Sequence, residues 1–220
     1  MGSEMCIRDR TKAGWLSALI PEKYGGSGLP LRAGAVILET IHRSGGSAAA
    51  CHAQMYTMGT LLRHGSEKQK QKYLPDIANG ALRLQAFGVT EPDSGSDTGN
   101  IKTRAKLVDD FYVVNGQKIW TSRALHSDLI LLLARTQPKP TDASRSKDGL
   151  SVFLIDLRDL KDQDIVIRPI DSMINHNTTQ LFFSDVKIPK ESLIGDEGQG
   201  FKYLPVSYTH LRAHETDSYL

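Results

Sequence analysis

The segment VTEPDSGSD, residues 89–97, concentrates side chains that could do chemistry. Two of its carboxylates, Glu91 and Asp97, are the residue types with which a hydrolase places a general acid and a general base across one bond. Spacing along one loop does not establish that geometry, and a turn closed by Asx-type hydrogen bonds is the favoured interpretation. Its Gly and Ser residues could present backbone N–H groups to a phosphate, yet no GxGxxG or Walker pattern follows a strand in this chain.

Composition and charge exclude several other classes of function. Cys6 and Cys51 are too few and too far apart for a disulfide framework or a zinc site. The balance of 27 Lys+Arg against 25 Asp+Glu gives no electrostatic case for a nucleic acid or an anionic membrane as partner. No apolar run approaches the roughly 18 residues that span a bilayer. Without a signal-peptide pattern, the chain is expected in a reducing compartment, the bacterial-type cytoplasm rather than the mitochondrial matrix, and is not expected to be secreted.

Residues 11–80 predict helices that could carry such a loop. In LRAGAVILETIHRS the apolar residues recur at spacings of three and four, which is typical of an amphipathic helix. A second apolar stripe follows between residues 47 and 64, and because it contains methionines it favours a helix core over a ligand site. The first face consists of Ala33, Val36, Ile37 and Ile41, and the second of Cys51, Met55, Met58 and Leu62.

A capping box predicts the start of one more helix in SEKQKQKYLPDIANG. Ser66 is followed three residues later by Gln69, the spacing at which side chain and backbone cap each other. Pro75 lacks a backbone N–H, so we expect the helix to kink or to end there.

From about Leu84 the apolar pattern changes to the alternation of strands. In IKTRAKLV, residues 101–108, apolar and basic side chains alternate, which predicts a half-buried strand. Further strands are predicted in DLILLLAR, GLSVFLIDL, DIVIRPI and TQLFFSDVKI. Because no helical pattern separates them clearly, the expected fold class is α+β, an N-terminal helical domain followed by an antiparallel β-barrel or sandwich.

Two dipeptides predict turns in this half. Asp109–Asp110 and Asn115–Gly116 flank the run FYVV, and Asn-Gly between apolar runs predicts a β-hairpin. Residues 137–149, QPKPTDASRSKDG, predict an exposed loop.

Both ends of the chain differ from the rest. MGSEMCIRDR shows no apolar period, and PVSYTHLRAHETDSYL follows GDEGQGFKYL without caps or a stop signal. We interpret residues 1–10 and 205–220 as translated read-through, with frayed native termini as the alternative.

In order and spacing, several segments resemble the acyl-CoA dehydrogenase family of flavoenzymes. The match covers residues 15–204 and includes IPEKYGGSGLP, HGSEKQKQKYLPDIANG, VTEPDSGSD, NGQKIWTS, LLLART and TTQLFFSDVKIPKESLIGDEGQGF. The resemblance implies an N-terminal helical domain over residues 11–84 and a middle β domain over residues 85–204. It also implies FAD between the middle domain and a C-terminal helical bundle, for which this chain has no matching segment.

The resemblance further implies which residues meet the flavin. The loop after LQAFGV would present small donors and acceptors to the polar edge of the ring, from which bulky side chains would be excluded. Trp120 would pack against the ring system, and Ser122 would hydrogen-bond the N5 region. Thr121 and Ser122 replace the family's usual Ile and Thr. The implied FAD-binding residues are Phe87, Val89, Thr90, Gly95, Ser96, Trp120, Thr121 and Ser122, of which Ser96 also lies close to the acyl-CoA substrate.

The implied activity is α,β-dehydrogenation of an acyl-CoA thioester. In the family a glutamate removes the α-proton while the flavin accepts the β-hydride, and that glutamate belongs to the C-terminal bundle. No residue here matches it, so the chain is expected to be an inactive fragment in which Glu91 and Asp97 shape the loop. The intact enzyme would pass electrons to an electron-transfer flavoprotein and assemble as a tetramer. An acyl-CoA oxidase-like relative and a non-catalytic binding module are the alternatives.

Overall fold

The computed structural model describes residues 9–142, 146–160, 165–173 and 177–204. The segments interpreted as read-through lie outside these ranges except for residues 9 and 10, as does part of the loop expected at 137–149. The chain divides into two compact units. The helical unit comprises the residues up to Ala86 together with His126–Leu129, and the β unit comprises Phe87–Leu125 and the residues from Ile130 onward.

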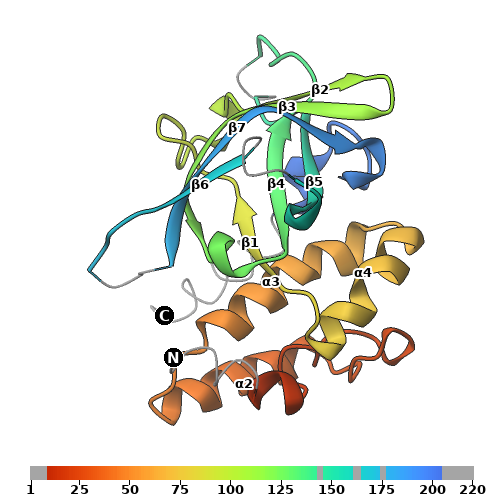
Figure 1. The fold of residues 1–220 in the computed structure, drawn as a ribbon, viewed down its shortest axis with the longest axis vertical. Coiled ribbons are helices and arrows are strands. Elements are labelled where there is room, and N and C mark those ends of the chain that lie inside the picture. Colours follow the sequence, from red (N-terminus) through yellow and green to blue (C-terminus); the bar gives the residue numbers. More distant parts are fainter. Residues whose placement is uncertain (1–8, 143–145, 161–164, 174–176, 205–220) are drawn as a thin grey trace. The chain divides into compact units, whose positions relative to one another are not determined.

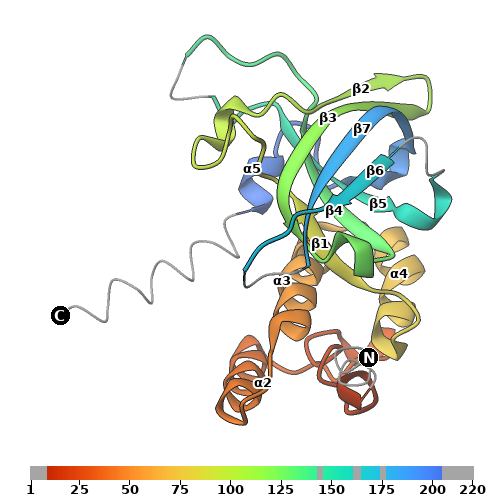
Figure 2. The same cartoon turned by 60° about the vertical axis from the view of Figure 1, so that its left-hand side comes forward.

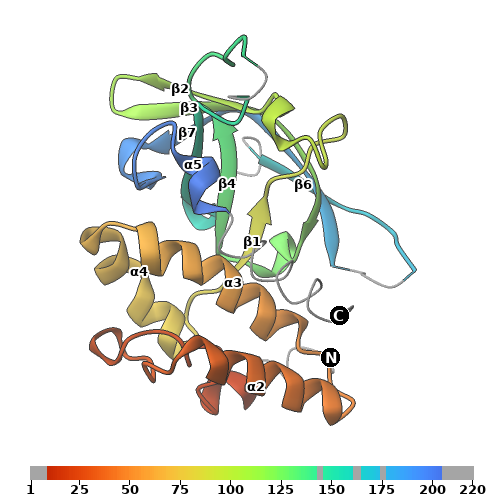
Figure 3. The same ribbon diagram turned by 180° about the vertical axis from the view of Figure 1, so that it is seen from behind.

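The helical unit confirms the expected helical half of the chain (Figure 1). After a short helical stretch at residues 9–12 and a 3-10 turn at Glu22–Tyr24, three longer helices follow. They are α2 (Leu31–Arg43), α3 (Ala49–His64) and α4 (Glu67–Asn79). Helix α3 contacts both α2 and α4, and the three helices are seen from behind in Figure 3. No helix among the described residues has the length and apolar character needed to cross a membrane.

The apolar stripe predicted for α3 is buried at Cys51, Met55 and Met58 and half-buried at Leu62, but the face predicted for α2 is wrong at one position. Val36 is 60% exposed, whereas Gly34 and Ile41 are buried and Leu38 is partly buried. A Cβ added at Gly34 would lie 3.4 Å from the sulfur of Met55, so the backbone of α2 closely approaches α3 at this glycine. Helix α2 faces α3 with the side that carries Gly34. Val36 therefore points toward solvent, because residues two apart lie on opposite sides of a helix.

Helix α4 confirms the capping box, and of the two alternatives expected at Pro75, a kink or an end, it excludes the end. The Ser66 hydroxyl accepts from the N–H of Gln69 at 3.2 Å, and the Gln69 side chain accepts from the N–H of Ser66 at 2.9 Å. The helix continues through Pro75 to Asn79 and ends at Gly80, whose φ of 83° is left-handed. Leu74 and Ile77 are fully buried on either side of Pro75, and their packing compensates for the one lost backbone hydrogen bond.

The β unit contains a mostly antiparallel sheet, as the alternating pattern predicts (Figure 2). Its order, β6-β7-β3-β2-β4-β5-β8 with β1 paired to β4, ends on different strands, so among the described residues the sheet is sandwich-like rather than a closed barrel. The pair β2–β4 is parallel. The strands are β1 (Leu84–Gly88), β2 (Arg104–Val108), β3 (Phe111–Ser122), β4 (Leu129–Arg135), β5 (Leu150–Asp156), β6 (Ile165–Pro169), β7 (Thr178–Pro189) and β8 (Leu193–Ile194), followed by the short helix α5 (Gly200–Tyr203).

One predicted hairpin is wrong. Asp109–Asp110 forms the turn between β2 and β3, but Asn115–Gly116 lies inside β3 at an irregularity in its pairing with β7. The Asn115 amide donates to Asp185 at 2.9 Å and accepts from its backbone N–H at 3.0 Å, so its polar groups are satisfied across the strands. A Cβ added at Gly116 would lie 2.4 Å from the Thr103 hydroxyl oxygen. The glycine is therefore needed for a close backbone approach at a bulge, a second use of the same dipeptide.

Candidate functional site

The loop that follows β1 is a tight turn closed by its own backbone. Glu91 and Ser94 exchange two backbone hydrogen bonds of 3.1 Å, with Pro92 and Asp93 at the tip. The Ser94 hydroxyl is buried and donates to the carbonyl of Asp97. The loop therefore has a defined shape, which agrees with the turn favoured by the sequence.

Glu91 connects this loop by hydrogen bonds to the two residues that precede the next strand, β2. One of its oxygens accepts from the N–H of Thr103 at 2.9 Å and the other from the N–H of Lys102 at 2.6 Å. Burial opposes ionisation of this carboxyl, but the charge of Lys118 and the Lys102 N–H together hold the pKa of Glu91 below its ordinary value. With each oxygen engaged, Glu91 shapes the loop, as expected, and is not available as a base.

Lys118, on β3, holds the other side of the loop. Its side chain is fully buried, and its ammonium donates to the carbonyl of Val89 at 3.0 Å and to Glu91 at 2.9 Å. Burial lowers the pKa of Lys118 to about 8, while the Glu91 carboxylate acts in the opposite direction. The next residue, Ile119, donates its N–H to the carbonyl of Thr90 at 2.9 Å. These contacts bring the segment after β1 against the end of β3.

Beyond Lys118, strand β3 carries an unusual backbone conformation. Trp120 has a φ of 60°, which is a strained value for a bulky side chain, and the register with β7 shifts between Lys118 and Thr121. The Trp120 side chain is 59% exposed. Arg123 also has a positive φ, of 63°, and its N–H donates to Asn177 at 2.7 Å. A bulge of this kind next to a polar loop is a way to aim a side chain at a ligand.

Thr121 behaves differently from its two neighbours. Its carbonyl accepts from the hydroxyl of Thr179 at 2.7 Å, and the residue is only 2% exposed. Its own hydroxyl oxygen is buried and has no hydrogen-bond partner among the residues that the structure describes. Ser122 is half-buried and pairs with Thr178 of β7.

The eight residues implied by the resemblance are therefore placed on two adjoining segments. Direct contacts connect Val89 and Thr90 with Lys118 and Ile119, just ahead of Trp120. The half-buried residues are Phe87, Val89, Thr90 and Ser122, the exposed ones are Gly95, Ser96 and Trp120, and Thr121 is buried.

Sequence reasoning assigned no role to Lys118, although its position carries a signal. In the part of β3 that precedes Trp120, the buried residues lie at even positions, since Tyr112 and Val114 are buried and Lys118 continues their period of two. A lysine on the buried face of a strand requires a carboxylate partner nearby.

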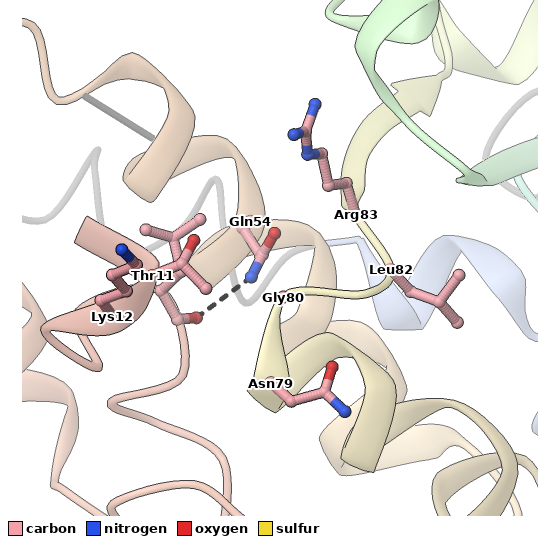
Figure 4. Close-up of a pocket in the computed structure, with 8 residues that line it drawn as sticks. Thr11, Lys12, Gln54, Asn79, Gly80, Leu82 and Arg83 are labelled. Carbon is pink, nitrogen blue, oxygen red and sulfur yellow. Dashed lines mark hydrogen bonds between the residues drawn. The ribbon is translucent and has the colours of Figure 1, made fainter. Parts of the chain in front are cut away.

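A separate pocket of about 420 Å³ lies within the helical unit (Figure 4). At its centre the Gln54 amide donates to the carbonyl of Leu16 at 3.2 Å and accepts from Gln85 at 3.2 Å. None of the eight implied residues lines this pocket. Within the described ranges, no three His, Cys, Asp or Glu side chains are grouped so that they could hold a metal ion.

Comparison with known proteins agrees with the two-unit architecture. The family model "acyl-CoA dehydrogenase, N-terminal domain" matches residues 3–81, and "acyl-CoA dehydrogenase, middle domain" matches residues 86–186. Glutaryl-CoA dehydrogenase of Desulfococcus multivorans is 33% identical over 95% of this chain and 53% of its own length. Cyclohex-1-ene-1-carbonyl-CoA dehydrogenase of Syntrophus aciditrophicus is 34% identical over 87% of this chain and 45% of its own length.

A solved structure extends the agreement to the fold. The crystal structure of acyl-CoA dehydrogenase from Geobacillus kaustophilus has a TM-score of 0.81 and 33% identity, covering 91% of this chain and 52% of that one. The chain thus spans about half the length of the relatives it matches. Two domain models in the expected order, relatives of the same kind and a shared fold lead to one conclusion: this chain belongs to the acyl-CoA dehydrogenase family.

Proposed function

We propose that this chain supplies the N-terminal helical domain and the FAD-binding middle domain of an enzyme that dehydrogenates an acyl-CoA thioester. The observation that carries the proposal is the meeting of the Val89–Thr90 segment with the end of β3, where Trp120 is exposed in a strained conformation. The names of two relatives specify different acyl groups on the same coenzyme, which supports a CoA thioester as the substrate class and leaves the acyl group open.

The residues present fit a flavin. The exposed indole of Trp120 offers a flat apolar face for a fused ring, and Gly95 leaves open space where an added Cβ would touch nothing within 4 Å. The buried Thr121 hydroxyl has no partner within the described residues, so this strand end also has unused hydrogen-bonding capacity.

When bound, FAD supplies the acceptor for the hydride that leaves the β-carbon of the acyl chain. Trp120 would cover the ring system, and the backbone and hydroxyl groups of Val89 and Thr90 would meet its polar edge. Ser122 would donate its hydroxyl to the N5 region, stabilising charge that develops there. Ser96, on the exposed side of the turn, would lie toward both the cofactor and the acyl-CoA chain.

The residues of the loop do not supply the base that removes the α-proton. Glu91 is buried and paired with Lys118, and Asp97 accepts from the Asn100 amide. We therefore propose that the base lies outside the matched residues and that the chain alone does not oxidise acyl-CoA. Transfer of electrons to an electron-transfer flavoprotein, and assembly into a tetramer, are proposed for the intact enzyme on the family resemblance.

The test measures FAD binding and turnover separately. The purified chain is titrated into FAD, and we expect weak, saturable quenching of flavin fluorescence. Trp120→Ala should weaken this binding by about tenfold, because the indole provides most of the flat contact area. Trp15→Ala is the matched control, since Trp15 is 38% exposed but belongs to the helical unit, and we expect no change.

The second arm adds acyl-CoA thioesters of several chain lengths without oxygen. We expect no bleaching of the flavin spectrum. Bleaching would show that the chain carries its own base and would refute the proposed inactivity. No saturable quenching of FAD, from a chain that is folded by circular dichroism, would refute FAD binding and favour a module that holds another ligand.

A further inference from the structure

We propose that Lys118 and Glu91 are positioning residues for the cofactor, because their buried ion pair sets the separation of the segments Val89–Thr90 and Trp120–Ser122. This inference rests on the proposed function, since those two segments are the ones assigned to the flavin. Neither Lys118 nor Glu91 is proposed to touch FAD or substrate.

The first support is the concentration of contacts at one point of β3. The Lys118 ammonium donates to the carbonyl of Val89 at 3.0 Å and to Glu91 at 2.9 Å, and the Ile119 N–H donates to Thr90 at 2.9 Å. Two successive residues of β3 therefore bind three successive residues of the loop. A loop held in this way cannot slide along the strand without breaking all three hydrogen bonds together.

The second support is a further set of hydrogen bonds, which the Glu91 carboxylate accepts from the segment before β2. The donors are the backbone N–H groups of Lys102 and Thr103, just before β2 begins. Lys118 and Glu91 are 0% and 6% exposed, so water cannot replace either partner when the pair is broken. Glu91 thus connects the loop to two neighbouring strands at once, and the ammonium completes its coordination.

The third support is a separate observation, the backbone conformation of Trp120. A non-glycine residue at a φ of 60° persists only when the structure on both sides of it is fixed. On the C-terminal side, the carbonyl of Thr121 is held by Thr179 at 2.7 Å. On the N-terminal side, the fixed point is Lys118, two residues before Trp120. Loss of this anchor would let the backbone relax and move the indole.

The aliphatic stem of Lys118 packs closely against Gly88 of β1. A Cβ added at Gly88 would lie 3.2 Å from Cγ of Lys118 and 3.3 Å from Cδ1 of Leu132, so the lysine stem fills the space above this glycine. Methionine has a similar unbranched stem, so Lys118→Met removes the charge and keeps the packing.

The experiment compares the wild-type chain with Lys118→Met, Glu91→Gln and the double variant. Lys118→Met leaves a buried carboxylate unpaired and should lower both stability and FAD affinity. The double variant carries no buried charge at this point, so its unfolding midpoint should return toward that of the wild type. Its FAD affinity should stay about tenfold below wild type, because the loop is no longer fixed to β3. The bound flavin's visible band should also lose its wild-type shape.

A further measurement, with a matched control variant, separates this inference from the proposed function. Amide hydrogen exchange without FAD should be faster at Ile119 in the double variant than in the wild type, since that N–H donates to Thr90. Lys102→Met is the matched control: its exposed pair with Asp93 belongs to the same loop, and neither exchange nor affinity should change.

If the double variant regains FAD affinity together with stability, the pair acts through stability alone and the inference is overturned. Unchanged exchange at Ile119 in the double variant would overturn it as well. A wild-type chain that binds no FAD would instead refute the proposed function, while hydrogen exchange would still decide whether the ion pair fixes the two segments.

Discussion

Glu91 of the β unit and Glu67 of the helical unit each bind several partners, but in opposite surroundings. Glu91 is 6% exposed and accepts from Lys118 and from two backbone N–H groups. Glu67 is 61% exposed and accepts from the Tyr24 hydroxyl at 2.7 Å, from Lys70 at 3.1 Å and from Lys23 at 3.4 Å. The number of partners is similar, so solvent access is the main difference between the two carboxylates.

This difference decides what each glutamate contributes. Water can replace a lost partner of Glu67, and salt screens its ion pairs, so each pair contributes little to folding. Around Glu91 no water can substitute, and removing one partner leaves a charge buried in a medium of low dielectric constant. The buried pair therefore constrains the geometry of the loop, whereas the exposed glutamate adds only solvent-accessible contacts between α4 and the turn Glu22–Tyr24.

The largest effect is expected from Glu91→Ala. It leaves the Lys118 ammonium buried with only the Val89 carbonyl as partner, so we expect the free energy of unfolding to fall by about 3–5 kcal/mol. Urea unfolding of the variant and the wild type at neutral pH measures this loss.

The pH dependence of the same variant checks the cause. Because burial lowers the pKa of Lys118 to about 8, from 10.5, the unfolded state binds more protons between these values. Removing the carboxylate lowers the pKa of Lys118 further, so the stability that Glu91→Ala loses relative to the wild type should shrink as the pH rises toward about 8. A loss that stays constant up to about pH 8 would show that cavity formation, rather than the unpaired ammonium, dominates.

A smaller effect is expected from Gly88→Ala, which introduces a steric overlap with the stem of Lys118 without removing a charge. The new methyl group would lie 3.2 Å from Cγ of Lys118, closer than ordinary packing, so we expect a loss of about 1–3 kcal/mol. Gly95→Ala is the matched control, since its Cβ would meet nothing within 4 Å, and its stability should stay within about 0.5 kcal/mol of wild type. Equal losses in thermal or urea unfolding for the two variants would contradict a packing origin.

The helical unit should respond to acid through Glu67. The hydrogen bond from Tyr24, followed by that from Lys70, lowers the pKa of Glu67 from 4.5 to about 2. The carboxylate therefore stabilises the fold above about pH 4.5, and this contribution is lost as the pH falls toward about 2. In Glu67→Gln, the thermal midpoint should fall less than in wild type between neutral pH and about pH 3. Parallel curves for the two proteins would refute this role.

The smallest effect is expected from Lys102→Met. Its partner is Asp93 at 2.8 Å, and their side chains are 75% and 72% exposed. The unfolding midpoint should match that of the wild type at physiological salt, with any difference at low salt disappearing as salt is added. A loss comparable to that of Glu91→Ala would remove the distinction between buried and exposed pairs drawn above.

Much of the fold could be predicted from the sequence because the deciding signals are local. The period of the apolar residues changes near Leu84, and the three longer helices α2, α3 and α4 precede that change whereas the strands follow it. The Ser66–Gln69 capping box formed as predicted, since both partners lie within one turn. The errors at Val36 and at Asn115–Gly116 share a cause. In both places a glycine, Gly34 or Gly116, permits a close approach from a distant segment, and local periodicity cannot show which segment approaches.

The candidate site likewise has features that the sequence predicted and features that only the tertiary structure showed. The order of the motifs alone identified the family and predicted eight FAD-binding residues on two segments. This was possible because each short motif, such as VTEPDSGSD or NGQKIWTS, is contiguous in the chain. Only the tertiary structure showed that Lys118 reaches back across the sheet to Val89 and Glu91, and that Trp120 adopts a left-handed conformation. Partners that are 27 residues apart meet only when β3 packs beside the loop, and the burial that makes their pairing matter exists only once the sheet has formed.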